Sequence, residues 1–488
     1  MTVITTYLGE KGYSIYKEEM TVNEQQFIRD ELTVRPYLPG SPIKLDAFPI
    51  YRESPKKFYI PRFFGNNTYG VPNEIKIDSG DDININFQGD LRDYQVNIVN
   101  TYMEHVKGEE GGGGLLEIPC GRGKTIMALN IIAKLKKKTL VIVHKGFLLN
   151  QWIERIETFL PDAKVGKIQG PVVDIEGKDI VIGMLQSLSM KEYPKNMFSC
   201  FGLTVCDECH HIAAEVFVRS LFNIVTPYTL GLSATMQRKD GLTKVFKQFL
   251  GDIIYTEKRD KTDNVEVRAI HYNNDDDEFS EIKYDYRGNP QYSTMITKLC
   301  NFNHRSEFII KVLGDLLEEN INQQIMIIAH NKALLSYLHD AIEHRHIAPV
   351  GFYVGGMKEK HLKESEVKKV ILATYAMAAE ALDIKTLSTL IMATPKTDVT
   401  QAVGRILRTK DHKPLVIDIV DQHDLFKKQW NKRRLFYTKQ DYKIISTSSE
   451  KYDKKEWTTV YEPGSKKSKK SKEPLQDSGL IGKCLIKI

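Results

Sequence analysis

Cysteine is scarce in this chain of 488 residues, and the six cysteines follow no regular spacing. Such usage argues against a disulfide-stabilised scaffold and favours a reducing compartment. The N-terminus lacks a basic region followed by a long apolar core, so we expect no signal peptide. Hydrophobic runs also stay short of the roughly 18 residues that a membrane-spanning helix requires. We therefore expect a soluble intracellular protein without a membrane partner.

The chain also lacks a strong excess of one charge, since 69 Lys and Arg face 63 Asp and Glu for a net charge of +6. Spread over this length, the basic excess fits an ordinary enzyme as well as a nucleic-acid-binding protein. Hydrophobic residues make up 41% and charged residues 27%, which suits a folded chain with sizeable cores. The length predicts about two to four domains.

The chain does contain a glycine-rich turn between an apolar run and a helix-like segment, Ile118-Pro119-Cys120-Gly121-Arg122-Gly123-Lys124-Thr125. Backbone N–H groups of such a turn and of the helix N-terminus can bind phosphates, and glycines let the backbone approach closely. Lys124 would add a positive charge on the outer phosphates, and the Thr125 hydroxyl could ligate Mg²⁺. Ile118 stands where the usual pattern has its first glycine. The turn therefore suggests a nucleoside triphosphate site that the rest of the chain must support.

Short apolar runs alternate with helical stretches in two parts of the chain. Each run is expected to be a buried strand, and the runs cover residues 115–118, 139–143, 180–184, 203–206, 229–232 and 253–255, then 325–329, 350–353, 370–373, 389–392 and 415–419. Continuous apolar runs of this length are typical of strands buried on both faces. Their alternation with helices predicts an α/β fold with two parallel sheets.

Changes in composition divide the chain into five parts. Residues 1–85, rich in proline and aromatics, predict a small accessory domain of short strands and turns. Two α/β domains are expected over residues 86–255 and 296–445, joined by a polar linker over residues 256–295. Residues 446–488 are a Lys/Ser-rich tail. The tail could bind phosphate backbones, act as a nuclear signal, or be only a solvated extension.

Two adjacent acids, Asp207 and Glu208, follow the apolar run over residues 203–206. Open parallel sheets bind ligands at the carboxyl ends of their strands. Asp207 could there hold Mg²⁺ through water, and Glu208 could polarise an attacking water. Residues 206–211, Cys-Asp-Glu-Cys-His-His, offer zinc-like spacing as a competing interpretation. A second ligand pair of matching spacing is missing from the sequence, so a closed four-ligand zinc site is the weaker interpretation.

Further polar residues accompany the two acids. Ser233 and Thr235 end another apolar run, where their hydroxyls could relay the nucleotide state through hydrogen bonds. Gln95, upstream of the glycine-rich turn, carries an amide that could recognise the adenine edge. Arg405 and Arg408 would share one face of a helix, and guanidinium groups suit a developing γ-phosphate charge. Arginines at this spacing are also common on exposed helix faces, so their role depends on the other motifs.

Taken together, these motifs resemble those of superfamily 2 helicases of the DEAD/DEAH type, over about residues 86–430. The matching segments are residues 118–125 (motif I), 139–152 (Ia), 207–210 (II), 233–235 (III), 371–383 (V) and 401–408 (VI). Motif V departs from the pattern, with Ala381 where a glycine is common. The substitution at Ile118 is one that many members of the superfamily tolerate.

Within the superfamily, residues 92–95, 119–121 and 233–241 are most similar to one branch. That branch contains DNA-repair and transcription-factor helicases and the transcript-release helicases of poxviruses and other large DNA viruses. The proline- and aromatic-rich N-terminal block and the short length also suit the viral members. A viral member would act in the host cytoplasm or nucleus and could be packaged in the virion.

The resemblance implies two RecA-like domains in tandem that bind ATP and Mg²⁺ in the cleft between them. Implied nucleotide-binding residues are Gln95, Ile118, Pro119, Cys120, Gly121, Arg122, Gly123, Lys124, Thr125, Asp207 and Asp383, with Thr125 and Asp207 on Mg²⁺. Implied catalytic residues are Glu208, Lys124, Gln401, Arg405 and Arg408. Ser233 and Thr235 would couple the motifs, and His144, Lys145 and Thr374 would contact nucleic acid.

The implied activity is ATP hydrolysis coupled to movement along nucleic acid. Closing the cleft would complete the catalytic set, and each closure would move one domain along the strand. We expect DNA in preference to RNA, a role in transcription or repair, and the transcription machinery as a further partner. One alternative is a translocase that releases transcripts or remodels duplexes without unwinding them. The other is the motor subunit of a restriction-type complex.

Overall fold

The computed structural model describes residues 4–37, 45–108, 111–119, 121–194, 196–211, 215–236, 238, 240–257, 264–380, 384, 386–406 and 413–464. Of the predicted site residues, Cys120, Asp383 and Arg408 lie outside this part of the chain, as does the lysine-rich run of the tail. For Arg405 the backbone is described and the side chain is not.

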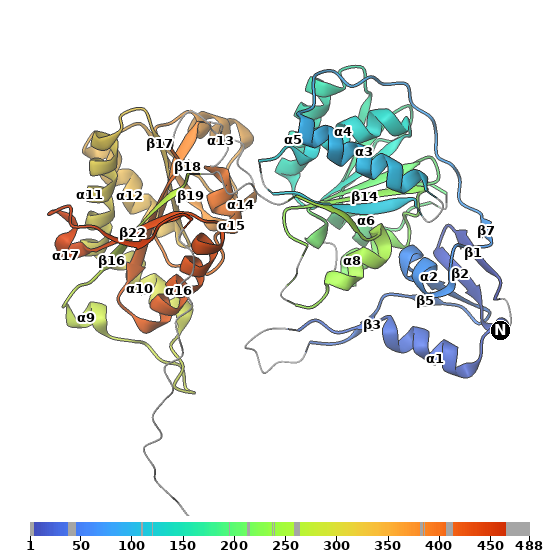
Figure 1. Cartoon of the computed structure of the whole chain (residues 1–488), viewed down its shortest axis with the longest axis horizontal. Helices are drawn as coiled ribbons and strands as arrows, with labels where there is room; N and C mark the ends of the chain where they lie inside the picture. The colour runs from blue at the N-terminus through green and yellow to red at the C-terminus, as the bar shows by residue number, and fades with distance from the viewer. Residues whose placement is uncertain are drawn as a thin grey trace, which may run out of the picture.

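Two eight-stranded sheets form two lobes, which lie side by side in Figure 1. The first sheet has the strand order β11-β10-β12-β9-β13-β14-β8-β15, and the second has the order β18-β19-β17-β20-β21-β16-β22-β23. All neighbouring strands run parallel except β10 with β11 and β22 with β23, which are edge pairs. This confirms the predicted α/β fold with two parallel-sheet domains in tandem.

The first lobe is a sheet covered by helices on both faces. Its strands are β8 (Gly113–Glu117), β9 (Thr139–Val143), β10 (Val165–Gln169), β11 (Val172–Val173), β12 (Ile180–Met184), β13 (Leu203–Asp207), β14 (Tyr228–Ser233) and β15 (Ile253–Thr256). Its helices are α3 (Asp93–Lys107), α4 (Lys124–Leu135), α5 (Gly146–Phe159), α6 (Leu185–Met190), α7 (Glu215–Leu221) and α8 (Thr243–Leu250).

Helices α3, α4 and α5 lie on one face of this sheet in Figure 1, and α6 and α8 lie on the other. Each face therefore has its own apolar cluster: one contains Ile98, Leu129 and Trp152, and the other contains Leu188 and Phe246. Because both faces are covered, every residue of β9 is buried, as expected for an uninterrupted apolar strand.

The second lobe repeats this arrangement. Its strands are β16 (Glu266–Tyr272), β17 (Gln324–Ala329), β18 (Val350–Tyr353), β19 (Val370–Thr374), β20 (Leu387–Met392), β21 (Leu415–Asp421), β22 (Lys443–Ser448) and β23 (Thr458–Tyr461). Its helices are α9 (Asp277–Ser280), α10 (Tyr292–Asn301), α11 (Asn303–Glu319), α12 (Lys332–His344), α13 (Glu359–Glu366), α14 (Tyr375–Glu380), α15 (Thr400–Arg405), α16 (Asp424–Lys439) and α17 (Ser449–Tyr452).

The structure corrects two of the expected boundaries. β16 lies between β21 and β22 in the second sheet, so residues 266–272 belong to the second lobe and not to the linker expected over residues 256–295. β22 and β23 likewise carry the sheet past residue 446, where the tail was expected to begin. Polar residues are frequent in all three strands, which made these segments look like polar connections in the sequence.

The N-terminal elements form a small sheet that we call the accessory region. Its elements are β1 (Thr6–Gly9), β2 (Gly12–Tyr16), α1 (Val22–Glu31), β3 (Thr33–Val34), β4 (Phe48–Pro49), β5 (Arg52–Glu53), β6 (Lys57–Ile60), α2 (Arg62–Tyr69) and β7 (Glu74–Ile75). The sheet has the order β5-β6-β2-β1-β7, and β3 pairs with β4. Tyr13 and Phe58 belong to the same buried cluster as Phe246 of α8. The accessory region and the first lobe therefore share one core.

Among the described helices, none combines the length and the apolar character that crossing a bilayer requires.

Candidate active site

The glycine-rich turn leaves the end of β8 and leads directly into α4. Gly121 and Gly123 have φ angles of 82° and 81°, in the left-handed region that favours glycine. A Cβ atom on Gly123 would lie 2.4 Å from Nε2 of Gln95, so a side chain at this position would also clash. Gly123 precedes α4 and makes no side-chain cap to it, and N–H groups at a helix N-terminus are donors that suit an anion. Phosphate binding fits this turn.

Gln95 holds the turn from the side. Its Nε2 donates to the carbonyl oxygen of Arg122 at 3.0 Å, and the Tyr94 hydroxyl donates to the same oxygen at 3.2 Å. Arg122 stacks its guanidinium on the Tyr94 ring at 4.5 Å and pairs with Glu257 at 2.8 Å. Adenine recognition by Gln95 stays a prediction. Positioning of the turn by the same amide is a role that sequence reasoning missed.

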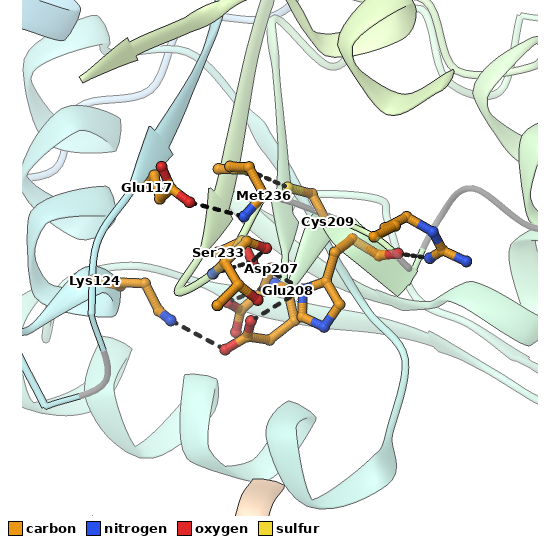
Figure 2. Close-up of polar contacts among 10 residues, drawn as sticks. Glu117, Lys124, Asp207, Glu208, Cys209, Ser233 and Met236 are labelled. Atoms are coloured by element: carbon orange, nitrogen blue, oxygen red, sulfur yellow. Dashed lines mark hydrogen bonds and ion pairs between the residues drawn. The ribbon is translucent and has the colours of Figure 1, made fainter. Parts of the chain in front are cut away.

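The ammonium of Lys124 lies between the turn and the two acids. Its Nζ is 3.1 Å from Oε1 of Glu208, and Figure 2 shows the two side chains pointing toward each other. Glu208 follows β13 with a left-handed backbone (φ 47°). The sequence prediction that the turn and the two acids meet is therefore supported by this ion pair.

Asp207 is fixed at the end of β13. One carboxylate oxygen accepts from Nε1 of Trp152 at 2.9 Å, and the other accepts from the backbone N–H of Glu208 at 3.0 Å. Burial, and after it the neighbouring Glu208 carboxylate, raise the pKa of Asp207 to about 6, although the charge of Lys124 acts against both. A buried carboxylate beside a second carboxylate favours a cation. These carboxylates and the Thr125 hydroxyl are hard oxygen donors of the kind that Mg²⁺ binds.

Ser233 connects three of the motifs. Its hydroxyl lies 2.8 Å from Nδ1 of His210 and donates to the carbonyl of Thr235 at 2.7 Å, and its own carbonyl accepts from the backbone N–H of Ile118 at 2.8 Å. Nδ1 of His210 is also 3.5 Å from Glu208. Burial lowers the pKa of His210, so the ring acts here as a neutral hydrogen-bonding group. The contacts give the predicted coupling role of Ser233 a physical path.

Arg238 extends this network and had no role in the sequence-based prediction. Its guanidinium donates to the carbonyl oxygen of His210, and its Nε donates to Asp240 at 2.9 Å. The carbonyl oxygen of Asp240 accepts from the N–H of Tyr37 in the accessory region at 2.9 Å. The arginine and aspartate that follow Ser233 in the sequence are the signal that could have pointed to this contact.

The competing zinc interpretation is not supported by the two cysteines it requires. Cys206 and Cys209 are both buried, and burial raises the pKa of each thiol. Sγ of Cys209 lies 3.9 Å from Sδ of Met236, a packing contact. Within the described part of the chain, no group of three His, Cys, Asp or Glu side chains is arranged to hold a metal.

All three predicted nucleic-acid residues lie at carboxyl ends of strands, but only Lys145 and Thr374 are partly exposed, whereas His144 is buried. Lys145 directly precedes α5, and Thr374 ends β19. The ring of His144 is only 8% exposed, and burial, followed by the charge of Lys145, lowers its pKa to about 4. A charge contact from the His144 ring to a phosphate is therefore disfavoured.

The second lobe contributes Gln401, which lies on α15 near the start of the helix. The side chain of Arg405 and all of Arg408 and Asp383 are outside the described residues. Their approach to the nucleotide stays a prediction. Described contacts between the lobes join α5 to α13: Asn150 donates to Glu359 at 2.6 Å, and Lys363 pairs with Glu154 at 2.6 Å.

Comparison with known proteins identifies the family. Residues 88–238 match the family described as "Type III restriction enzyme, res subunit". A protein of Acanthamoeba polyphaga mimivirus, named "Putative ATP-dependent RNA helicase L396", is 35% identical over 90% of this chain and 86% of its own length. The chain belongs to the superfamily 2 helicases.

Two further comparisons agree with this assignment. A protein of African swine fever virus, named "Putative ATP-dependent RNA helicase QP509L", is 28% identical to this helicase over 68% of this chain and 70% of its own length. The structure of S. cerevisiae Dbp5 bound to RNA and ADP BeF3 covers 73% of this chain and 90% of its own, with a TM-score of 0.51 at 12% identity, which shows a shared fold. The predicted ATP-hydrolysing helicase class is thereby confirmed, and this helicase uses ATP and acts on nucleic acid.

Proposed function

We propose that this helicase couples ATP hydrolysis to movement along DNA, in preference to RNA, during transcription or repair. The observation that carries the proposal is the Lys124–Glu208 ion pair, which joins a phosphate-binding turn to two acids at the carboxyl edge of a parallel sheet. The preference for DNA is supported by motif resemblance to the repair and transcription branch. The RNA helicase names of the viral relatives make RNA the competing substrate.

Lys124 is proposed to exchange partners during the cycle. With phosphates in the turn, its ammonium would move from Glu208 to the outer phosphates, because one ammonium cannot neutralise both. Glu208 would then be free to accept a proton from the attacking water. Asp207 and Thr125 would hold Mg²⁺, which supplies positive charge to the phosphate oxygens when bound. This exchange links nucleotide binding to activation of the general base.

The second lobe is proposed to complete the site. Arg405 and Arg408, with Gln401, would reach the γ-phosphate when the lobes close, and their charge would stabilise the transition state. Lys145 and Thr374 would contact the strand backbone, so closure would shift one lobe along the strand. Thr235 and Ser233 would relay the change through His210.

An ATPase assay with single- and double-stranded DNA and RNA as stimulators tests the proposal. We expect stimulation by nucleic acid, larger with DNA, and none in Lys124→Ala, which should lose turnover. Hydrolysis at the wild-type rate in purified Lys124→Ala would refute the site. Equal or larger stimulation by RNA would refute the DNA preference and leave the site intact.

The second candidate is the motor subunit of a restriction-type complex, acting as a translocase that does not unwind, because residues 88–238 match a family named after a restriction enzyme subunit. Displacement of a bound block from a strand, measured beside strand separation on the same substrate, distinguishes the two activities.

A further inference from the structure

The chain between α9 and α10 forms a short hairpin over residues 283–291. In Figure 1 the connection between these two helices projects beyond the lower edge of the second lobe. Tyr286 is 89% exposed and Tyr284 is 56% exposed. Among the described residues, Tyr286 is the most exposed large hydrophobic side chain. A tyrosine displayed on a projecting hairpin is available to a partner.

Hydrogen bonds within the hairpin hold its tip in shape. The Asp285 carboxylate accepts from the backbone N–H groups of Arg287 and Asn289, both at 2.8 Å. The N–H of Asp285 donates to the carbonyl of Asn289 at 2.8 Å, and Tyr284 bridges to Pro290. The backbone bonds hold the pKa of Asp285 below its usual range, so the carboxylate stays charged and the bonds persist. The tyrosine is thus presented by an ordered backbone, which reduces the entropy lost on binding.

The root of the hairpin reaches the carboxyl edge of the second sheet. The N–H of Gln291 donates to the carbonyl of Lys283 at 2.8 Å and closes the hairpin. The next residue, Tyr292, donates its hydroxyl to the carbonyl of Pro395 at 3.0 Å, just past β20. Its ring packs edge-on against His330, which follows β17, with centroids 6.2 Å apart.

The same row of contacts ends beside a predicted nucleic-acid residue. The ring of His330 lies 4.7 Å from that of Tyr375, and Tyr375 directly follows Thr374 at the end of β19. Parallel sheets bind ligands at this edge. The hairpin is therefore anchored at the edge where the strand is proposed to lie.

The chemistry of the tip favours bases over phosphates. The Arg287 guanidinium lies 5.0 Å from the centroid of the Tyr286 ring, so a cation and an aromatic face are presented together. Two carboxylates, Asp285 in the tip and Glu281 near the root, repel a phosphate backbone. The charge of Lys283 does not offset this repulsion, because Lys283 is paired with Glu281 at 2.6 Å. A stacked base needs an aromatic face and gains from a neighbouring guanidinium. A continuous duplex hides its base faces, so the fitting ligand is an unpaired base.

We propose that Tyr286 is a stacking contact for an unpaired base of the strand on which this helicase moves. The proposal rests on the proposed function, because it places the strand at the carboxyl edge of the second sheet. It adds a contact made by a hairpin outside all the helicase motifs that the sequence displays.

Photo-cross-linking with full-length protein tests the contact directly. Single-stranded DNA and RNA carrying 5-iodouracil are irradiated with the wild type, and the attached peptides are mapped. We expect a cross-link within residues 283–291. Tyr286→Ala should lose this cross-link and bind a single strand about fivefold or more weakly. Tyr286→Phe, which keeps the ring, should bind within about twofold of the wild type. Tyr37→Ala, at another exposed tyrosine, is the matched control and should change neither readout.

ATPase measurements separate failure of this contact from failure of the proposed function. Tyr286→Ala should keep the basal ATPase rate, because the residue lies outside the catalytic machinery. Wild-type affinity in Tyr286→Ala, or cross-links that all map elsewhere, would overturn the contact even if nucleic acid stimulates the wild-type ATPase. Absence of such stimulation in the wild type would overturn the proposed function, and the contact with it.

Discussion

The first lobe has two neighbours in this molecule, and it holds them in different ways. The accessory region shares a buried apolar core with it, to which Tyr13 and Phe58 contribute. The second lobe meets it, among described residues, through Phe147 and through exposed polar pairs between α5 and α13. Exposed pairs contribute about 0–1 kcal/mol each, whereas a buried core is costly to separate.

This difference in attachment predicts which parts of the molecule move relative to one another. The accessory region and the first lobe should behave as one body, and the second lobe should be free to approach and withdraw. The nucleotide turn, both acids and the Ser233–His210 contact are all in the first lobe, so they are assembled before closure. The residues that closure is proposed to add to the site come from the second lobe.

The largest effect should come from removing Arg405, the arginine that closure is proposed to bring to the nucleotide. Arg405→Ala should lower the ATPase rate by about 10³-fold or more, with little loss of ATP binding, because the guanidinium stabilises charge that develops in the transition state. Turnover and nucleotide affinity are measured together. Arg434→Ala, an exposed arginine of the same lobe, is the control. Unchanged turnover in Arg405→Ala would remove its proposed role.

A comparable loss should arise inside the first lobe. Glu208→Gln should lower turnover by about 10²–10⁴-fold, because an amide cannot accept the proton of the attacking water. ATP binding should persist, since Lys124 no longer has a carboxylate to neutralise. Glu215→Gln, in an exposed pair with Arg219, should leave turnover unchanged. If Glu208→Gln hydrolyses ATP normally, the general base lies elsewhere.

The sequence predicts the strands well where both faces of a sheet are covered. The apolar runs over residues 139–143 and 180–184 coincide with β9 and β12. β16 was not predicted because Arg268 and His271 separate its apolar residues. In the structure Arg268 pairs with Glu266, the first residue of the strand, at 2.8 Å. Polar residues within a strand make the segment resemble a linker when the side chains that pair with them are not known.

At the site, the sequence predicts which motifs meet but not what holds them. The motifs predict that Lys124 and Glu208 belong to one nucleotide site, but the direct ion pair between them is seen only in the structure. The Trp152 bond to Asp207 and the Arg238 bond to His210 depend on how α5 and the segment after β14 pack, which local patterns do not determine. For His144 the sequence suggests a contact with nucleic acid that its burial disfavours, and this burial could not be inferred from its place after an apolar run.

A smaller effect tests how the accessory region is attached. Arg62 donates to the carbonyl of Pro227 at 2.8 Å, and burial lowers its pKa to about 10, so it remains charged. Arg62→Ala would leave buried carbonyls without a donor and should cost about 1–3 kcal/mol of unfolding free energy. Thermal unfolding should show the accessory region and first lobe melting together at a lower temperature. Arg29→Ala, at a partly exposed pair with Glu53, should shift the melting temperature far less.

The smallest effect should be a change in how stability depends on pH when His144 is replaced. The pKa of His144 is lowered to about 4 in the folded chain, so the unfolded chain binds more protons between about pH 6.5 and pH 4. Its contribution to stability is therefore present at neutral pH and is lost as the pH falls through this window. His144→Gln, neutral at every pH, should show a shallower loss of melting temperature on acidification.

His144 and Lys145 together test the placement of the strand beside the first lobe. If the buried ring makes no phosphate contact, His144→Gln should keep its affinity for nucleic acid at neutral pH, whereas Lys145→Ala should weaken binding and reduce its salt dependence. Equal losses in both variants would mean that the ring is exposed to the strand when nucleic acid binds. The first lobe would then change conformation when it binds nucleic acid. The accessory region and the first lobe would not behave as one rigid body during the cycle.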